Sequence, residues 1–542
     1  MQVLGWCLFP GSMVAHVEVS VNGGPMERAR IAMDRGDLPR HTGDPVAPIS
    51  GFEHKPDLSD TPDDVRTVRI EAIAHAVDGR THRLRPVEFV LAPRQPSFRD
   101  EDPAAAAELR ERSMRPLARR EPRPPSGGGQ VRLLAYTHML VHGGASLYLL
   151  ELLRRLNGGF SCDVVTLADG PLREDFEALG IPVHVTDGFP ITSVARYEGH
   201  LAEIVGWAAA GDYDAVLVNT LGAFPGGDLA ARLGVPAVWA VHESFALPMF
   251  WHTAYPPGAL HPYVRRQAEQ ALASAAAVVF EAEATRRLFL GDVDPERLVT
   301  LPYGVELEAI DAARASLDRA QAREELAIDP DAQVVLCLGT IEPRKSQTML
   351  AAAFAQIAHR HPRAQLVLVG ETREQYCATY GESLREYVRR AGLGDCVRIE
   401  PVTDEPYKWH AVADLLVCAS DVESLPRVIL EAMAFGTPVL STRVFGVPEL
   451  IEDGRTGYLC EMRDVPDLAA GIERALTATD AERGAMARAA SDRVRERHDA
   501  RAYAQRIEEL LRGFAAEPNA LPLDLLGGTH AVEGRPGAHS AR

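Results

Sequence analysis

The chain has few of the features that would place it in a membrane, on a nucleic acid or outside the cell. Its seven cysteines are scattered, odd in number and form no Cys-x-x-Cys pair, which favours a reduced, cytosolic setting. No hydrophobic run is long enough to cross a bilayer, and residues 1–15 lack the basic leader of a signal peptide. Acidic residues outnumber basic ones, 76 to 57, so no nucleic-acid partner is expected.

Composition divides the chain into distinct regions. A chain of 542 residues is too long for one hydrophobic core. Residues 1–93 contain short alternating runs separated by Asn-Gly and Asp-Gly turns, which predicts antiparallel strands in a small β-sandwich. Residues 94–130 are rich in proline, arginine and glycine and are predicted to be a linker. Residues 513–542 are rich in proline, glycine and small residues and are predicted to be disordered.

From residue 131 onward, apolar runs alternate with helical segments. This alternation predicts parallel, doubly wound sheets. The pattern ends and restarts around residues 302–305, which indicates a hinge between two Rossmann-like domains, 131–303 and 304–512. The predicted fold is α/β, with two such domains facing a cleft behind the small β-sandwich.

The most informative segment is 419–439, which places Glu423 and Glu431 eight positions apart around the start of a helix. A buried strand is predicted over residues 414–419, so Glu423 is expected beyond the carboxyl end of that strand, where ligands of parallel sheets bind. Each carboxylate can accept hydrogen bonds from two hydroxyls, which suits a polyol. The alternative is an ordinary capped helix with two solvated glutamates.

A second candidate site is the Pro-Arg-Lys turn of Arg344 and Lys345, which follows a strand and opens a helix. Backbone N–H groups and two cations at such a turn can hold a pyrophosphate. The alternative is a solvated basic pair on the surface.

Three further loops follow predicted strands and can contribute to the same cleft. One carries a glycine pair that lets the backbone approach a ligand, one carries a strand-end histidine, and one can supply backbone N–H groups. A tight turn, a structural histidine and a plain connection are the respective alternatives. The residues are Gly143 and Gly144, His242, and Phe445, Gly446 and Val447.

Together these motifs resemble the retaining GT-B glycosyltransferases of family four, the group 1 set that uses nucleotide sugars. The resemblance covers about residues 131–512. It is strongest over residues 419–460, where the Glu-x7-Glu element, a Gly-Thr-Pro-Val turn and the segment 453–458 follow one another in the family's order. The chain departs from the family at Thr340 and Ser346, where many members have Arg and Gly. Residues 1–93 lie outside the transferase fold and are similar to β-rich modules fused to some bacterial glycosyltransferases.

The resemblance implies a hexosyltransferase that moves a sugar from a UDP- or GDP-sugar to a glycan, lipid or small-molecule acceptor with retention of configuration. It implies that Glu423 contacts the donor sugar, Glu431 the ribose, and Arg344 and Lys345 the diphosphate. It further implies that His242 binds the sugar or acts near the reacting carbon, and that the glycine pair borders the donor phosphate.

No metal and no other cofactor is expected, because cations and helix N-termini would neutralise the leaving diphosphate. Two Asp-x-Asp pairs, 212–214 and 292–294, do not lie at a strand's carboxyl end, where a metal would serve the donor. The expected location is the cytoplasm, either free or peripheral at the inner membrane face, with a saccharide or lipid-linked acceptor and with contact to a membrane or assembly complex left open.

Two other functions fit the same fold. A non-hydrolysing nucleotide-sugar epimerase would need additional acids in the cleft, which the Glu-x7-Glu and Arg-Lys pattern suits less. A non-catalytic carbohydrate-binding or scaffold protein would keep the fold without the activity. In addition, the N-terminal module could dock the enzyme to a polysaccharide assembly machine.

Overall fold

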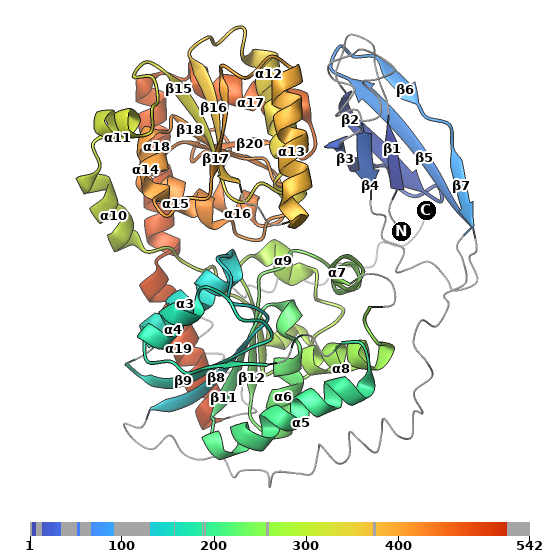
Figure 1. Ribbon diagram of the computed structural model, residues 1–542, viewed down its shortest axis with the longest axis vertical. Helices are drawn as coiled ribbons and strands as arrows, with labels where there is room; N and C mark the ends of the chain where they lie inside the picture. The colour runs from blue at the N-terminus through green and yellow to red at the C-terminus, as the bar shows by residue number, and fades with distance from the viewer. Residues whose placement is uncertain are drawn as a thin grey trace, which may run out of the picture.

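The computed structural model describes residues 3–6, 14–33, 51–54, 67–90, 130–156, 158–186, 188, 191–255, 259–371 and 375–517. These residues form three sheets, one in an N-terminal β-module and one in each of two α/β domains (Figure 1). The predicted linker, apart from residue 130, and the predicted tail beyond residue 517 lie outside the described residues.

The N-terminal module is antiparallel and β-rich, as predicted, but its described strands form one sheet of seven strands. The strand β3 pairs with β2 along its first half and with β4 along its second half, and so joins what the sequence predicts as a sandwich of two sheets. The strands are β1 (Val3–Trp6), β2 (Val14–Val21), β3 (Glu27–Met33), β4 (Gly51–His54), β5 (Thr67–Ala76), β6 (Thr81–Arg83) and β7 (Val87–Val90).

The module lies against the second α/β domain. Arg28 of β3 forms an ion pair of 2.9 Å with Asp464 and donates a hydrogen bond to the carbonyl oxygen of Met462. Buried side chains of the module, such as Val17 and Val68, belong to the same hydrophobic cluster as buried side chains of the second domain. The module and this domain therefore share a core.

The first α/β domain has an all-parallel sheet in the order β10-β9-β8-β11-β12-β13-β14. Its central strands are buried along their whole length because helices cover both faces. The strands are β8 (Val131–Thr137), β9 (Phe160–Thr166), β10 (Val183–Val185), β11 (Ala215–Asn219), β12 (Ala237–Val241), β13 (Ala277–Phe280) and β14 (Leu298–Thr300). The helices are α3 (Gly144–Leu156), α4 (Arg173–Ala178), α5 (Val194–Gly211), α6 (Pro225–Leu233), α7 (Leu247–Ala254), α8 (Pro262–Ala273) and α9 (Glu283–Arg287).

The second α/β domain repeats this architecture, with the parallel order β17-β16-β15-β18-β19-β20. Its strands are β15 (Gln333–Leu338), β16 (Ala364–Glu371), β17 (Val397–Pro401), β18 (Leu415–Cys418), β19 (Val439–Thr442) and β20 (Tyr458–Cys460). The helices that follow the hinge are α10 (Leu307–Ser316), α11 (Arg319–Glu325), α12 (Gln347–Ile357), α13 (Gln375–Arg390), α14 (Pro406–Val412), α15 (Arg427–Phe435), α16 (Val447–Leu450), α17 (Val465–Thr477), α18 (Asp480–Arg497) and α19 (Ala500–Ala516).

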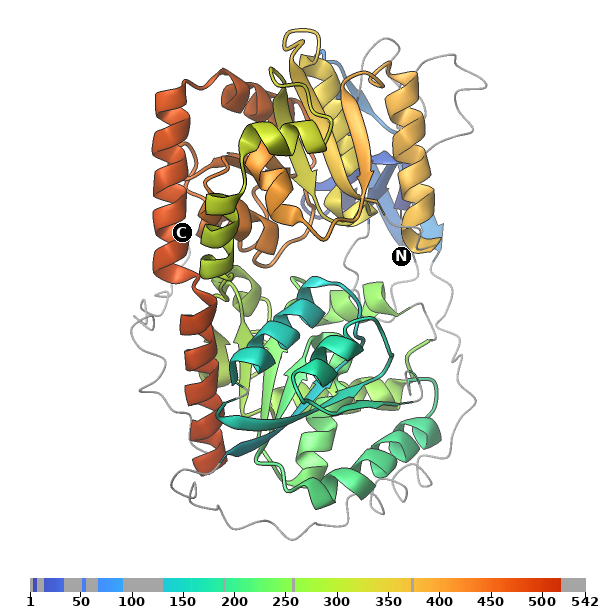
Figure 2. The same ribbon diagram turned by 60° about the vertical axis from the view of Figure 1, so that its left-hand side comes forward.

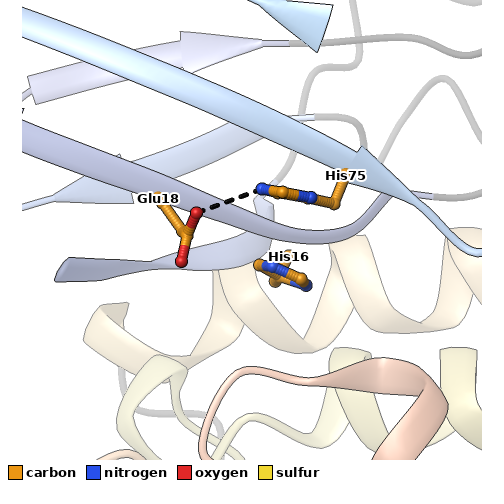
Figure 3. A group of neighbouring side chains, drawn as sticks. All are labelled: His16, Glu18 and His75. Carbon is orange, nitrogen blue, oxygen red and sulfur yellow. Dashed lines mark hydrogen bonds and ion pairs between the residues drawn. The ribbon is translucent and has the colours of Figure 1, made fainter. Parts of the chain in front are cut away.

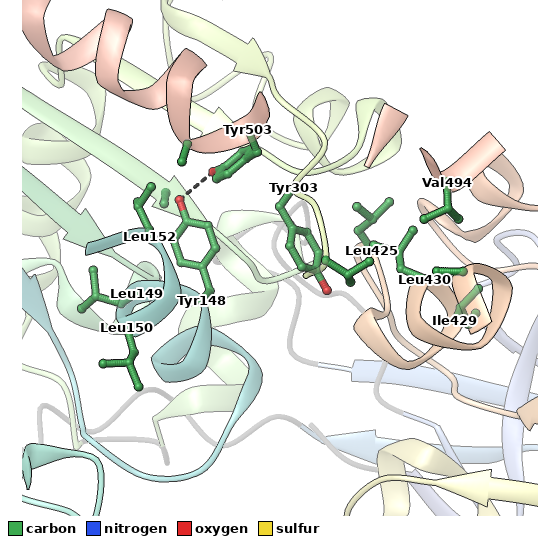
Figure 4. Close-up of a cluster of buried hydrophobic side chains, with 14 of the residues drawn as sticks. Tyr148, Leu149, Leu150, Leu152, Tyr303, Leu425, Ile429, Leu430, Val494 and Tyr503 are labelled. Carbon is green, nitrogen blue, oxygen red and sulfur yellow. Dashed lines mark hydrogen bonds between the residues drawn. The ribbon is translucent and has the colours of Figure 1, made fainter. Parts of the chain in front are cut away.

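The segment 302–305, predicted to be a hinge, lies against a second segment of the chain, residues 498–500. Val305 donates its N–H to the carbonyl oxygen of His498 and accepts a hydrogen bond from the N–H of Ala500. At Gly304 a Cβ atom would lie 2.2 Å from the carbonyl carbon of Asp499, so only glycine fits between the two crossing segments. Buried side chains on both sides of this crossing, including Tyr303 and Leu425, form one continuous cluster (Figure 4).

The last helix, α19, returns to the first domain (Figure 2). The hydroxyl groups of Tyr503 and Tyr148 are hydrogen-bonded at 2.6 Å, and Arg512 donates to the carbonyl oxygen of Gly159. The sequence assigns residues up to 512 to the second domain and places a disordered tail from 513, whereas this helix packs on α3 and continues to Ala516. Its buried apolar stripe, which includes Ile507, explains the difference.

None of the helices in the described part of the chain is long and apolar enough to cross a membrane.

Candidate active site

The carboxyl edges of the two parallel sheets meet between the domains. Glu449, in the second domain, accepts hydrogen bonds from the N–H groups of Glu283 and Ala284, which follow β13 in the first domain. The hydroxyl of Thr285 lies 3.1 Å from that of Ser424 and 3.3 Å from that of Ser244. A row of three buried hydroxyls therefore connects the loop after His242 with the loop that carries Glu423.

Glu423 is buried and is held between two cations. Lys345 Nζ lies 2.5 Å from its Oε1, and a guanidinium nitrogen of Arg344 lies 3.4 Å from the same oxygen. Burial raises the pKa of Glu423, but the two neighbouring cations outweigh it and hold the pKa below the usual value. The carboxylate consequently stays ionised and acts as a hydrogen-bond acceptor.

The loops that carry these three residues are tied together by the backbone. The N–H of Asp421 donates to the carbonyl oxygen of Arg344, and the Arg344 guanidinium donates to the carbonyl oxygen of Val422. Ser346 adopts a left-handed conformation, φ 54°, and its hydroxyl donates to Asp421. Glycine adopts such a left-handed position more readily than serine does.

Glu431 lies on α15, two turns beyond Glu423, and is also buried. Burial raises its pKa above the usual value, and the adjacent Arg427 opposes this without cancelling it. Arg427 lies 2.7 Å from Glu431 and also 2.7 Å from Glu151 of the first domain. One guanidinium thus joins the two domains beside the predicted ribose site.

His242, at the end of β12, is fixed by a hydrogen bond at each ring nitrogen. Nδ1 lies 2.5 Å from Glu281, and Nε2 lies 2.8 Å from Oδ1 of Asn219. The orientation of the Asn219 amide is determined because its Nδ2 donates to the carbonyl oxygen of Ala145. Both partners of the imidazole are therefore acceptors, and both ring nitrogens carry a proton.

The direction of the pKa shift of His242 favours its protonated form. Burial lowers its pKa, but the Glu281 carboxylate more than offsets this, so the pKa lies above its ordinary value. The neighbouring His138 differs, because burial, followed by the charge of His242, lowers its pKa to about 4. The two histidines at the carboxyl edge of the first sheet therefore have pKa values shifted in opposite directions, upward for His242 and downward for His138.

The two predicted ligand loops differ in the space around their glycines. A Cβ atom at Gly144, the first residue of α3, would meet no protein atom within 4 Å, so packing of the chain does not explain this glycine. At Gly446 a Cβ atom would lie 2.1 Å from the carbonyl oxygen of Ser424 and 2.5 Å from Cβ of Ala282. Phe445 has φ 38°, and Val447 begins α16. The loop 443–446 is thus a tight contact between the domains.

The structure brings the predicted residues to one interdomain region and adds partners that sequence reasoning missed. Glu281 directly follows β13, and a polar residue at the end of a buried strand is a signal that could have identified it. Arg427 could have been identified from its position four residues before Glu431. No local pattern in the sequence indicates Glu151, because Arg427, with which it pairs, is 276 residues away.

Comparison with known proteins shows the family. The model for glycosyl transferases group 1 matches residues 332–478, and the model for Glycosyltransferase Family 4 matches residues 142–309. The D-inositol 3-phosphate glycosyltransferase of Nocardioides sp. is 30% identical over 384 residues, which are 65% of this chain and 81% of the relative. The chain belongs to the group 1, family 4 glycosyltransferases. It is a transferase enzyme, and both family models begin after the β-rich module.

Further relatives support the same family, and solved structures support the fold. The D-inositol 3-phosphate glycosyltransferase of Streptomyces scabiei is also 30% identical over 384 residues, 63% of this chain and 84% of the relative. Anabaena Alr3699/HepE, solved in complex with UDP and glucose, has a TM-score of 0.60 at 24% identity and covers 71% of this chain and 100% of its own. A glycosyltransferase from Rickettsia africae has a TM-score of 0.62 at 15% identity, with coverage of 72% and 100%. These structures confirm the GT-B fold, with its two Rossmann-like domains.

Proposed function

We propose that this glycosyltransferase takes a sugar from a UDP- or GDP-sugar, retains its anomeric configuration and needs no metal for the transfer. The observation that carries the proposal is the buried Glu423 carboxylate, held by Lys345 and Arg344 at the edge where the two sheets meet. The glycosyltransferase names of the relatives and the UDP complex of the structural neighbour support a nucleoside diphosphate sugar as donor.

Each donor group has a matching group in the site. The diphosphate takes the cations of Arg344 and Lys345, together with the backbone N–H groups of the loop 445–447. Glu423 accepts hydrogen bonds from the sugar hydroxyls, and Glu431 accepts them from the ribose. The open approach to Gly143 and Gly144 lets the backbone at the start of α3 border the donor phosphate.

The transfer step balances without a metal or an added base. The bond between the anomeric carbon and the diphosphate oxygen breaks, and its electron pair leaves with the diphosphate. The acceptor hydroxyl oxygen bonds to the same face of the anomeric carbon, and its proton passes to the leaving phosphate oxygen. Arg344 and Lys345 neutralise the charge that develops on the leaving group.

His242 contributes a fixed positive charge rather than a base. Both its ring nitrogens donate hydrogen bonds to protein acceptors, so it has no lone pair with which to remove a proton. We assign it the stabilisation of negative charge near the reacting carbon. The acceptor, a saccharide or a lipid-linked saccharide, enters from this domain.

A donor screen tests the proposal. Calorimetry with UDP, GDP and ADP and their sugars is made on the wild type, on Glu431→Ala and on Glu496→Ala, an exposed control on α18. One nucleotide is expected to bind the wild type and the control equally. The Glu431→Ala variant is expected to bind about tenfold or more weakly, since a hydrogen bond to a charged group contributes about 1.5–3 kcal/mol.

Two outcomes contradict the proposal. Binding of no nucleotide by folded protein favours the scaffold function. Tight binding that Glu431→Ala leaves unchanged would remove the ribose assignment.

A further inference from the structure

Three potential metal ligands lie together in the N-terminal module (Figure 3). His16 on β2 is the register partner of His75 on β5, and Glu18 lies two residues further along β2 on the same face of the sheet. The two imidazole rings are stacked, with centroids 4.1 Å apart. Nε2 of His75 lies 3.1 Å from Oε2 of Glu18.

The three side chains are close enough to share one ion. One ligand atom from each lies within 4.8 Å of the other two, and in the described part of the chain no other set of three or more such residues meets this criterion. Zinc bonds of about 2.0–2.2 Å in a tetrahedron require ligand atoms about 3.4 Å apart. Binding would therefore require one of the stacked rings to rotate about its side-chain bonds.

We propose that His16, Glu18 and His75 form a structural binding site for a divalent transition-metal ion of the zinc class. Two imidazole nitrogens and one carboxylate oxygen are a donor set that zinc uses, with water completing the coordination. All three side chains are half-buried, which leaves room for that water. The ion would replace the proton shared by His75 and Glu18.

The charges beside the site do not exclude a cation. The positive charge of Arg28 would repel an ion, but Arg28 is ion-paired with Asp464 at 2.9 Å.

The position of the site gives the ion a role in module docking. Arg28 is the register partner of Glu18, and the same Arg28 contacts the second domain at Asp464 and Met462. An ion that joins β2 to β5 would hold Glu18 and its neighbours rigid at this contact. The site therefore links metal binding to the attachment of the module.

Titration of full-length protein with Zn²⁺ tests the proposal. The wild type is expected to bind one more equivalent than His16→Ala and His75→Ala. The matched control is His82→Ala, because His82 is exposed on β6, which pairs with β5 in the same module. Equal binding by the wild type and His75→Ala, or loss of binding in His82→Ala alone, overturns the site.

A second variant and a spectroscopic measurement keep the test valid if an alanine variant misfolds. Glu18→Gln preserves side-chain shape and is expected to weaken Zn²⁺ binding at least about tenfold, since it removes a ligand charge. Co²⁺ in the wild type is expected to show d–d absorption without a thiolate charge-transfer band, and Glu18→Gln should diminish it. A thiolate band, or absorption unchanged in Glu18→Gln, assigns the ion to other residues and contradicts the proposal.

Discussion

At the scale of single residues, the charge on Glu423 is the central feature of the proposed donor site. Its carboxylate balances Lys345, whose side chain is 19% exposed, and part of the charge of Arg344. Burial lowers the pKa of Lys345, but Glu423 more than compensates, so the lysine remains charged. Removing the carboxylate would leave a cation with too little water around it.

The substitution Glu423→Gln is therefore expected to reduce kcat/KM by about 100-fold or more, as for the loss of other preorganised electrostatic groups. It is also expected to lower the free energy of unfolding by about 2–3 kcal/mol, because Lys345 loses its partner. Initial rates and denaturant unfolding measure the two effects. Glu342→Gln is the matched control, since Glu342 pairs with Arg344 but not with Lys345; equal loss in both variants would contradict this role of Glu423.

The pair of His242 and Glu281 predicts a pH dependence of stability. The pKa of His242 is raised in the folded protein, so its contribution to stability is complete below the ordinary value of about 6.5 and is lost as pH rises through the folded pKa. Glu281→Gln should thus destabilise the protein most near pH 6 and progressively less at higher pH. Denaturant unfolding of both proteins across this range measures it; a difference that grows with pH would refute the assignment of an imidazolium.

At the scale of elements, the loop 443–446 and the helix α16 connect the proposed donor site to the first domain. Phe445 is held at positive φ, and a backbone carbonyl oxygen passes within 2.1 Å of where a Cβ of Gly446 would lie. The positive φ of Phe445 is a strained conformation, and such strain persists only where surrounding contacts maintain it. Here those contacts include the two hydrogen bonds from the start of α9 to Glu449.

Gly446→Ala is expected to push this loop away from Ser424 and Ala282 and to raise the KM for the donor, while the protein remains folded. The physical reason is that backbone, rather than a flexible side-chain end, occupies the space of the new methyl group. Donor kinetics and thermal melting measure the effect. Gly394→Ala serves as the matched control, because Gly394, like Gly446, has no positive φ, but no atom lies within 4 Å of the position of its Cβ. Equal donor KM in the wild type and Gly446→Ala would exclude the proposed contact.

At the scale of the whole molecule, two crossings of the chain join the domains. Gly304 and Asp499 touch at the hinge, and α19 carries the end of the chain back onto α3. The Arg427–Glu151 ion pair lies across the same junction. The two domains are therefore joined by a backbone contact that a residue larger than glycine cannot enter.

Truncation after Asp499 is expected to make the first domain aggregate or unfold, because it uncovers the apolar surface that α19 buries. The buried residues of α19 are Ala500, Tyr503, Ala504, Ile507, Leu510, Leu511 and Phe514. Truncation after Glu517 is the matched control, since it retains this helix and its contacts. Soluble yield and thermal melting compare the two; a stable, active protein lacking α19 would show that the first domain folds without it.

Much of the site could be predicted from local pattern. Glu423, Arg344 and His242 each follow a buried strand, and the carboxyl ends of parallel strands lie at one edge of a sheet. That rule places each residue correctly within its own domain. It contains no information about partners on another domain, so the link from Arg427 to Glu151 and the hydroxyl contact between Thr285 and Ser424 depend on how the two domains meet.

The sequence by itself determined the two α/β domains and the residues at the strand ends, because hydrophobic period and turn chemistry are local properties of the chain. Only the tertiary structure decided the hydrogen-bond partners of His242, since these come from β11 and the segment after β13. It also decided the return of α19 to the first domain and the meeting of His16 with His75. The latter depends on strand register, and a shift of one residue would place the two side chains on opposite faces.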